Sequence, residues 1–206
     1  FQQLAQNEIR AIKGDLKKNI WIVPDNVLYR YNFWNKKLTP YRFPNALTTG
    51  IAISASGIIW VTTSTGILKR YNEAQDAFTD FDLSKQFKNP ILAIQDIYPI
   101  ADTAILVGSM YNVLLFNPAN GNIRNVLKES TLTKNIQVHK IVQRSPTEFW
   151  LGTETGVYIV DVTANKAVQI QKERENPFSL TDNVIYTLYK DREGSIWLGT
   201  FFGGIN

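Results

Sequence analysis

Short segments in which apolar and polar residues alternate run along the whole chain, separated by clusters of Gly, Asn, Asp and Ser. Alternation with a period of two predicts β-strands with one buried face, and the clusters predict turns between the strands. The segment Val184–Leu188, for example, is followed by the turn residues 191–194 and by a second apolar segment, Ile196–Thr200. No window has the apolar spacing of an amphipathic helix. The pattern therefore predicts an all-β protein.

One of these apolar segments recurs five times and defines a repeat. Its central residue, called the anchor below, is tryptophan in four copies and leucine in the third: Trp21, Trp60, Leu106, Trp150 and Trp197. The anchors are 39, 46, 44 and 47 residues apart, with a mean of 44. This period, with four short strands in each repeat, is typical of the blades of a β-propeller. We expect one propeller segment over residues 1–206, with repeats at about 5–44, 45–88, 89–133 and 134–178 and an incomplete repeat at 179–206.

The turn residues agree with this repeat. Gly57 and Gly194 each stand three residues before an anchor tryptophan, where a tight hairpin needs a residue that tolerates a positive φ. Asp15 and Asp191 each stand six residues before one, where a carboxylate can accept hydrogen bonds from turn amides. Both pairs predict a tight turn before the anchor strand.

The five anchors are predicted to be structural rather than functional. They recur regularly, and leucine replaces tryptophan at one of them. That behaviour favours packing between neighbouring blades over stacking on a ligand, because large buried rings contribute strongly to core stability.

The composition excludes several kinds of site. The chain has no cysteine, so it can form neither a disulfide nor a thiolate metal site. The single histidine, His139, has no acidic residue at metal-ligand spacing, and we expect it to be structural or at the surface. The 22 Lys and Arg residues are scattered among 18 Asp and Glu residues, unlike the basic stripe of a nucleic-acid-binding surface. We therefore expect no metal, no cofactor and no nucleic-acid partner.

Catalytic motifs are also missing from the sequence. There is no nucleophile elbow, no phosphate-binding loop and no metal motif. The acidic residues fall mostly at turn positions, where local hydrogen bonding accounts for them. We expect the chain to have no catalytic residue and no enzymatic activity of its own.

The last repeat carries a more specific pattern. Residues 176–206 contain, in order, Ser-Leu-Thr-Asp-Asn, the strand Val184–Leu188, Gly-Ser-Ile-Trp-Leu-Gly-Thr and Gly-Gly-Ile-Asn. This set resembles the two-component regulator propeller repeat. The earlier repeats resemble it less closely: Trp21 is followed by Ile-Val-Pro, and Leu106 replaces the tryptophan.

The resemblance implies the periplasmic sensor region of a Bacteroides-type hybrid two-component system. In such proteins a membrane helix, a histidine kinase, a receiver and a DNA-binding domain lie elsewhere in the parent chain. Many of them respond to oligosaccharides and control polysaccharide-utilisation genes. This chain has no apolar run of the roughly 18 residues that a membrane helix needs, so membrane attachment is expected only through an inner-membrane parent protein.

Two ring architectures remain open. About four and a half repeats could form a small closed ring of four or five blades, or an arc of a larger ring. The incomplete last repeat and the resemblance favour an arc of a seven-bladed propeller. An arc exposes blade faces and strand edges. We therefore expect the isolated chain to self-associate, or to pack against the remaining blades of its parent.

The candidate ligand residues lie in loops that propellers gather on one face around the central channel. Tyr111, Glu154, Phe201 and Phe202 follow the second strand of their repeats and vary between repeats. Asp182 and Asn183 lie in a loop between repeats and belong to the repeat consensus. Aromatic rings can stack on sugar faces, while carboxylates and amides bond the hydroxyls.

We therefore expect a non-catalytic sensing module that binds an oligosaccharide. Two alternatives remain open: a scaffold propeller that binds another protein, and a polysaccharide-degrading enzyme.

Overall fold

The computed structural model of the protein describes residues 8–24, 27–84, 93–127 and 136–206. Across these ranges the regular elements are β-strands and the short 3₁₀ helix η2 (Glu73–Gln75). None of the described helical segments is long and apolar enough to cross a membrane. The described residues therefore have the all-β structure that the alternating pattern predicts.

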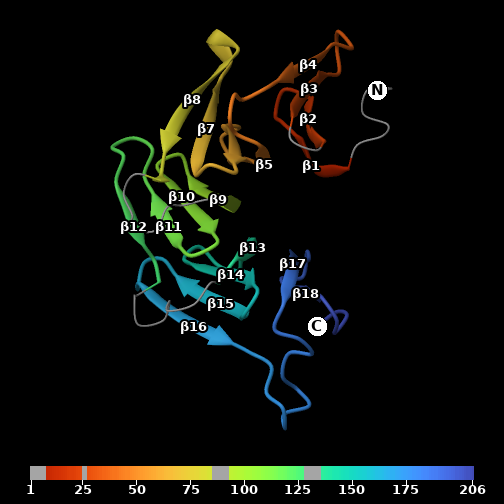
Figure 1. Ribbon diagram of the computed structural model, residues 1–206, viewed down its shortest axis with the longest axis vertical. Coiled ribbons are helices and arrows are strands. Elements are labelled where there is room, and N and C mark those ends of the chain that lie inside the picture. Colours follow the sequence, from red (N-terminus) through yellow and green to blue (C-terminus); the bar gives the residue numbers. More distant parts are fainter. Residues whose placement is uncertain (1–7, 25–26, 85–92, 128–135) are drawn as a thin grey trace. The chain divides into compact units, whose positions relative to one another are not determined.

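The strands form sheets in which sequence neighbours pair side by side, four strands to a sheet in the first four and two in the last (Figure 1). The strands are β1 (Ile9–Gly14), β2 (Asn19–Pro24), β3 (Leu28–Asn32) and β4 (Leu38–Tyr41); β5 (Thr48–Ile53), β6 (Ile59–Thr63), β7 (Ile67–Asn72) and β8 (Ala77–Asp82); β9 (Ile94–Ala101), β10 (Ala104–Ser109), β11 (Val113–Phe116) and β12 (Ile123–Asn125); β13 (Val138–Gln143), β14 (Glu148–Thr153), β15 (Gly156–Asp161) and β16 (Lys166–Ile170); and β17 (Ile185–Lys190) and β18 (Ile196–Thr200). Each four-stranded sheet corresponds to one repeat, which is the blade architecture of a propeller.

The chain divides into two compact units. The first contains the described residues up to Ile94 together with Pro99–Asp102, and the second contains Gln95–Tyr98 and Thr103–Asn206. The first unit therefore holds β1–β8, and the second holds β10–β18. The expected repeat boundaries at 44/45 and 178/179 fall in turns or bends. Those at 88/89 and 133/134, and the expected start at residue 5, lie outside the described residues.

In the first unit, Trp21 fills the space between the sheets β1–β4 and β5–β8. Its side chain is fully buried in a cluster with Ile51 and Ile59 of the second sheet. The Trp21 ring stacks on Tyr41 at a centroid distance of 5.8 Å and meets Tyr71 edge-on at 5.0 Å. Trp21 therefore joins two neighbouring sheets through ring packing.

A polar network ties the same two sheets together. The hydroxyls of Tyr41 and Tyr71 each donate to Oδ1 of Asp76 at 2.6 Å, and Nη1 of Arg30 lies 3.1 Å from that oxygen. The Tyr41 hydrogen bond, followed by that of Tyr71, holds the pKa of Asp76 below its usual range. Burial, reinforced by the bond to Asp76, raises the pKa of Tyr41. The network thus favours a charged Asp76 beside two neutral tyrosines.

The turns before the anchor strands have the predicted chemistry. Gly57 and Gly194 have φ values of 89° and 91°, which are favourable for glycine. Oδ1 of Asp15 accepts two amides of its own turn, at 2.8 and 2.9 Å, and Oδ1 of Asp191 does the same at 2.8 and 3.0 Å. In both turns Oδ2 accepts the indole N–H of the tryptophan six residues later, at 2.8 Å. The sequence did not predict this second bond.

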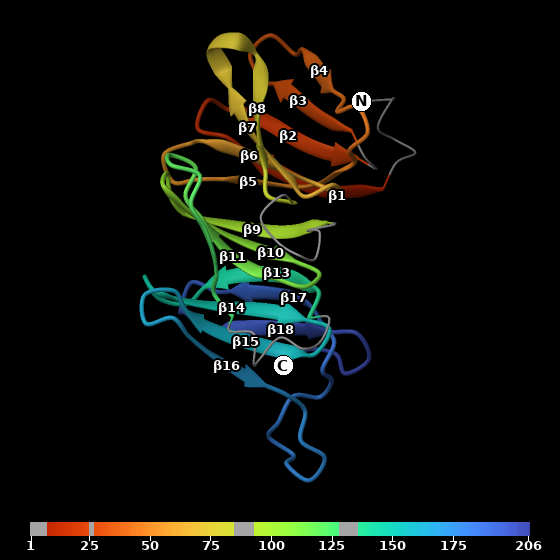
Figure 2. The same cartoon turned by 60° about the vertical axis from the view of Figure 1, so that its left-hand side comes forward.

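The anchors of the second unit are not equally buried. Leu106 is fully buried, and Trp150 is partly buried against Ile185 and Leu188 of the next sheet. Trp197 is 51% exposed. The sheet β17–β18 packs on β13 and β14 through its other face (Figure 2), so no described sheet covers the Trp197 face. Packing between two sheets, which the sequence predicts for every anchor, is therefore seen at Trp21 and Trp150 and stays a prediction for Trp197.

Candidate functional site

Two β-bulges, one repeat apart, bring together the residues of the candidate site in the second unit. The pairing of β13 with β14 shifts register between Val138 and Lys140, which leaves His139 as the extra residue. The pairing of β17 with β18 shifts in the same way around Tyr186. His139 and Tyr186 both precede their anchors by eleven residues. Bulges re-aim side chains, and here they place two rings of neighbouring sheets against each other.

The rings form a continuous stack that we call the aromatic row: His139, Tyr186, Phe201 and Phe202. The rings of His139 and Tyr186 are 4.6 Å apart and nearly parallel at 14°. Tyr186 and Phe201 follow at 5.4 Å and 29°, and Phe202 meets Phe201 edge-on at 4.3 Å. Phe201 is 56% exposed and Phe202 is 87% exposed. The row therefore lies at the surface at Tyr186, Phe201 and Phe202 rather than filling a core, with Tyr186 sandwiched between His139 and Phe201.

A carboxylate stands at the buried end of the row. Glu154, in the loop between β14 and β15, places Oε1 2.7 Å from Nε2 of His139. The main-chain N–H of Glu154 donates to the carbonyl of Ile136 at 3.1 Å, which fixes the loop that carries this side chain. The His139 side chain is 11% exposed and that of Glu154 is 33% exposed. The carboxylate is therefore held in place but remains accessible.

A second carboxylate fixes the exposed end. Oδ2 of Asp182 accepts the Phe202 N–H at 3.0 Å, and Oδ1 accepts the Val184 N–H at 3.4 Å. The bond from Phe202 is the main reason that the pKa of Asp182 lies below its usual range. The Phe201 N–H donates in turn to the Val184 carbonyl at 3.0 Å. Asp182 therefore stays charged and orders the loop that carries the two phenylalanines.

The structure brings four of the six candidate ligand residues together: Glu154, Asp182, Phe201 and Phe202. Asn183 accepts the Lys172 N–H at 2.6 Å through its side-chain oxygen, so that atom serves the local fold. Tyr111 lies in the β10–β11 loop and is partly buried. Across the part of the chain that the structure describes, no ring contact links Tyr111 to the aromatic row.

Sequence reasoning did not assign His139 or Tyr186 to a ligand site. The available signal was their equal offset of eleven residues from Trp150 and Trp197. That offset indicates equivalent places in adjacent blades, but the ring stacking depends on the bulges.

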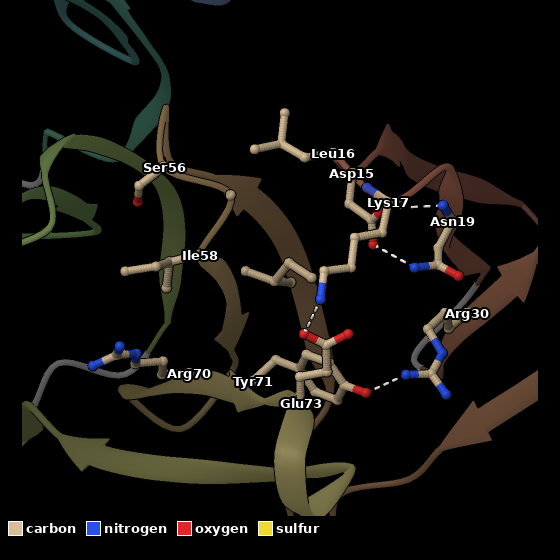
Figure 3. A pocket seen from close by; sticks show the side chains of 12 residues that line it. Asp15, Leu16, Lys17, Asn19, Arg30, Ser56, Ile58, Arg70, Tyr71 and Glu73 are labelled. Carbon is tan, nitrogen blue, oxygen red and sulfur yellow. Dashed lines mark hydrogen bonds and ion pairs between the residues drawn. The ribbon is translucent and has the colours of Figure 1, made fainter.

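The first unit contains a separate cavity of about 270 Å³ between its two sheets (Figure 3). Four of the five charged residues around it are already paired: Lys17 with Glu73 at 2.5 Å, Arg30 with the Tyr71 hydroxyl, and Asp15 with its own turn. The fifth, Arg70, lies over the Trp60 ring at 5.9 Å. Figure 3 shows the Lys17–Glu73 pair extending between the two sheets. Because these groups satisfy one another, we interpret the cavity as part of the packing between blades rather than as a ligand site.

Within the described ranges, no group of three or more His, Cys, Asp or Glu side chains is placed to hold a metal ion.

The matches to known proteins agree with the repeat. Residues 179–202 match the two component regulator propeller family, which confirms the resemblance of the last repeat. The matched segment includes Tyr186, Phe201 and Phe202 of the aromatic row.

Longer similarities cover nearly the whole chain. It is 26% identical over 200 residues to Histidine kinase P4 of Formosa agariphila, covering 90% of this chain and 14% of that protein. The extracellular domain of a putative hybrid two-component system of B. thetaiotaomicron is 23% identical with a TM-score of 0.83, covering 96% of this chain and 26% of that one. Virginiamycin B lyase of Staphylococcus aureus is 17% identical with a TM-score of 0.74, and the match covers 97% of this chain and 69% of the lyase chain.

The chain therefore spans only a small part of the sensor-type relatives that it matches. The similarity to the two solved structures concerns the fold, which is the all-β propeller that the repeat period predicts. The predicted fold class is confirmed.

Proposed function

We propose that this chain, which carries a two-component regulator propeller repeat, is a non-catalytic part of the ligand-sensing region of a two-component receptor. It binds an oligosaccharide on the aromatic row, in an extracytoplasmic compartment of the cell. Domains outside this chain, a histidine kinase and a DNA-binding domain, carry the signal to genes for polysaccharide utilisation. An inner-membrane parent protein provides the membrane attachment.

The aromatic row is the observation that carries the ligand class. Three exposed rings stand in sequence, with fixed backbone on either side and carboxylates near both ends. Flat apolar faces suit the C–H faces of sugar rings, and an ionised carboxylate accepts strong hydrogen bonds from hydroxyls. The exposed rings and the accessible Glu154 carboxylate of this one unit therefore support an oligosaccharide as the ligand class.

The comparisons support the receptor part of the proposal. One relative is named a histidine kinase, and one solved neighbour is the extracellular domain of a putative hybrid two-component system. The family that matches residues 179–202 is itself described as a two-component regulator propeller.

Binding at this place offers a route to a conformational signal. His139 belongs to β13 and Tyr186 to β17, so the row crosses from one sheet to the next. A ligand shifts an equilibrium only through different affinities for two states. A sugar stacked along the row favours the arrangement in which the two sheets hold the rings in line.

The test is calorimetric titration of the 206-residue protein with a panel of oligosaccharides. Replacing both Phe201 and Phe202 by alanine is expected to weaken binding about tenfold or more, because each ring contact contributes about 0.5–1.5 kcal/mol. Phe178→Ala is the matched control, since Phe178 is 95% exposed in the same unit and lies outside the row. The control should bind as the unchanged protein does.

Three results would overturn the proposal. If no oligosaccharide binds while a purified protein partner does, the chain is a scaffold. Shortened sugar products in the titration mixture would indicate a degrading enzyme. Equal losses of oligosaccharide affinity in the double variant and in Phe178→Ala would show that the aromatic row is not the binding site.

A further inference from the structure

The polar groups of the aromatic row are unevenly charged. Glu154 and Asp182 contribute two carboxylates, and the one basic group in the row is His139. The next residue along β13, Lys140, is engaged elsewhere: its Nζ lies 2.9 Å from Oδ2 of Asp96. Lys172 lies close enough to Asp182 to act on its charge, but that carboxylate is already occupied by main-chain amides.

Glu154 is the carboxylate that a ligand would meet. Its Oε1 is taken by His139, whereas its Oε2 makes no hydrogen bond to any residue within the described ranges. The Glu154 side chain is one-third exposed, and the hydrogen bond from its main-chain N–H to the Ile136 carbonyl holds the loop in position. Asp182 differs, because both of its oxygens accept main-chain N–H groups.

We propose that Glu154 determines specificity at the aromatic row by admitting uncharged saccharides and excluding those that carry carboxylate or sulfate groups. This inference rests on the proposed function. A sugar hydroxyl can donate to Oε2 of Glu154, and such charge-assisted bonds are stronger than neutral ones. A uronate or sulfate at the same place has no proton to donate and adds like charge in a partly desolvated site.

The experiment compares two ligands that differ only in that charge. A neutral oligosaccharide that binds is titrated in parallel with its C6-oxidised counterpart, in which one CH₂OH group has become a carboxylate. Titrations are run at low and at high NaCl concentration. For the unchanged protein we expect the uronate to bind about tenfold more weakly at low salt or not at all, with a smaller difference at high salt as ions screen the repulsion.

Two variants assign the effect to one residue. Glu154→Gln keeps an oxygen acceptor but removes the charge, and should bring the two ligands to within about threefold of each other. Glu193→Gln makes the same change in net charge in the turn between β17 and β18, at the opposite end of that hairpin from Phe201. The Glu193 variant should discriminate as the unchanged protein does.

NMR can follow this site directly through the His139 side chain. His139 is the only histidine of the chain, so its imidazole proton signals in NMR report on this site alone. The neutral sugar should shift these signals, and Glu154→Gln should move them before any sugar is added while the far-UV circular dichroism stays unchanged.

The outcomes separate this inference from the proposed function. Equal affinity for both ligands, or preference for the uronate, overturns the role of Glu154 and leaves oligosaccharide sensing intact. The same loss of discrimination in Glu193→Gln shows that net charge, not Glu154, is responsible. If neither sugar binds, the proposed function fails and this inference fails with it.

Discussion

At the scale of single residues, the anchor tryptophans differ in whether their indole N–H is satisfied. The N–H of Trp21 donates to Asp15 at 2.8 Å, but the buried N–H of Trp60 has no acceptor among the described residues. The residue six positions before Trp60 is Ser54 rather than aspartate. Its shorter side chain accepts the Ile58 amide at 3.0 Å but makes no bond to the indole. A one-residue change in the turn thus leaves a buried donor unpaired.

This difference predicts unequal effects of one substitution. Trp21→Phe removes a hydrogen bond from a partly buried carboxylate, whereas Trp60→Phe removes a donor that has no acceptor. We expect Trp21→Phe to lower the free energy of unfolding by about 1–2 kcal/mol more than Trp60→Phe, since an unpaired buried group costs about 1–3 kcal/mol. Urea unfolding of the two variants measures the difference. Equal decreases in the free energy of unfolding would mean that the Asp15–Trp21 hydrogen bond makes no net contribution to stability.

At the scale of elements, the residue two positions after the anchor sets how closely two sheets approach. A Cβ added to Gly108 would lie 2.5 Å from Cγ1 of Val138, and one added to Gly152 would lie 2.9 Å from Cγ2 of Ile185. Val138 and Ile185 belong to the first strands of the following sheets. The glycine of the repeat is therefore required here by close packing between neighbouring sheets, not by a special backbone angle.

The close approach predicts that Gly108→Ala destabilises the protein by about 1–3 kcal/mol, the usual effect of an extra methyl group in a packed interior. Gly14→Ala is the control. Gly14 ends β1, and a Cβ there would meet no atom within 4 Å. That change should leave stability unaltered or raise it by about 0.4–1 kcal/mol through the unfolded state. Thermal and urea unfolding compare the stabilities of the two variants. If Gly108→Ala leaves the stability unchanged, the close packing of the two sheets is not what requires this glycine.

At the scale of the whole molecule, the sheets at the two ends of the blade series expose apolar side chains. In the last sheet Trp197 pairs across the strands with Tyr189, and both are exposed. In the first sheet Ile9 and Ile12 of β1 are exposed. Within the chain, the equivalent faces of Trp21 and Trp150 are covered by the following sheet. The exposed faces are therefore suited to the same kind of packing.

We predict that the 206-residue chain self-associates through these faces. Sedimentation velocity should show a species that grows with protein concentration. Trp197→Arg should weaken the association about tenfold or more, as expected for a central aromatic contact. Val168→Arg is the control, because Val168 is also exposed but lies in β16, outside this face. A strictly monomeric protein at every concentration would contradict the prediction.

The sequence by itself determined the strands, their turns and the repeat, since each follows from short-range physics. Side-chain alternation depends on the two-residue period of a strand, and the turn before the anchor depends on the φ of Gly194 and the reach of Asp191. These relations involve residues a few positions apart, so they can be read from the order of residues.

Only the tertiary structure decided which side chains meet. Trp150 and Trp197 have the same Trp-Leu-Gly-Thr context, yet one packs against a neighbouring sheet and the other is half exposed. Glu154 and Phe201 were both candidates, but their connection through His139 and Tyr186 depends on two bulges in separate sheets. Tyr111, chosen by the same reasoning, has no ring contact with this row within the described residues. Contacts between residues dozens of positions apart depend on how whole sheets pack, which local sequence patterns do not specify.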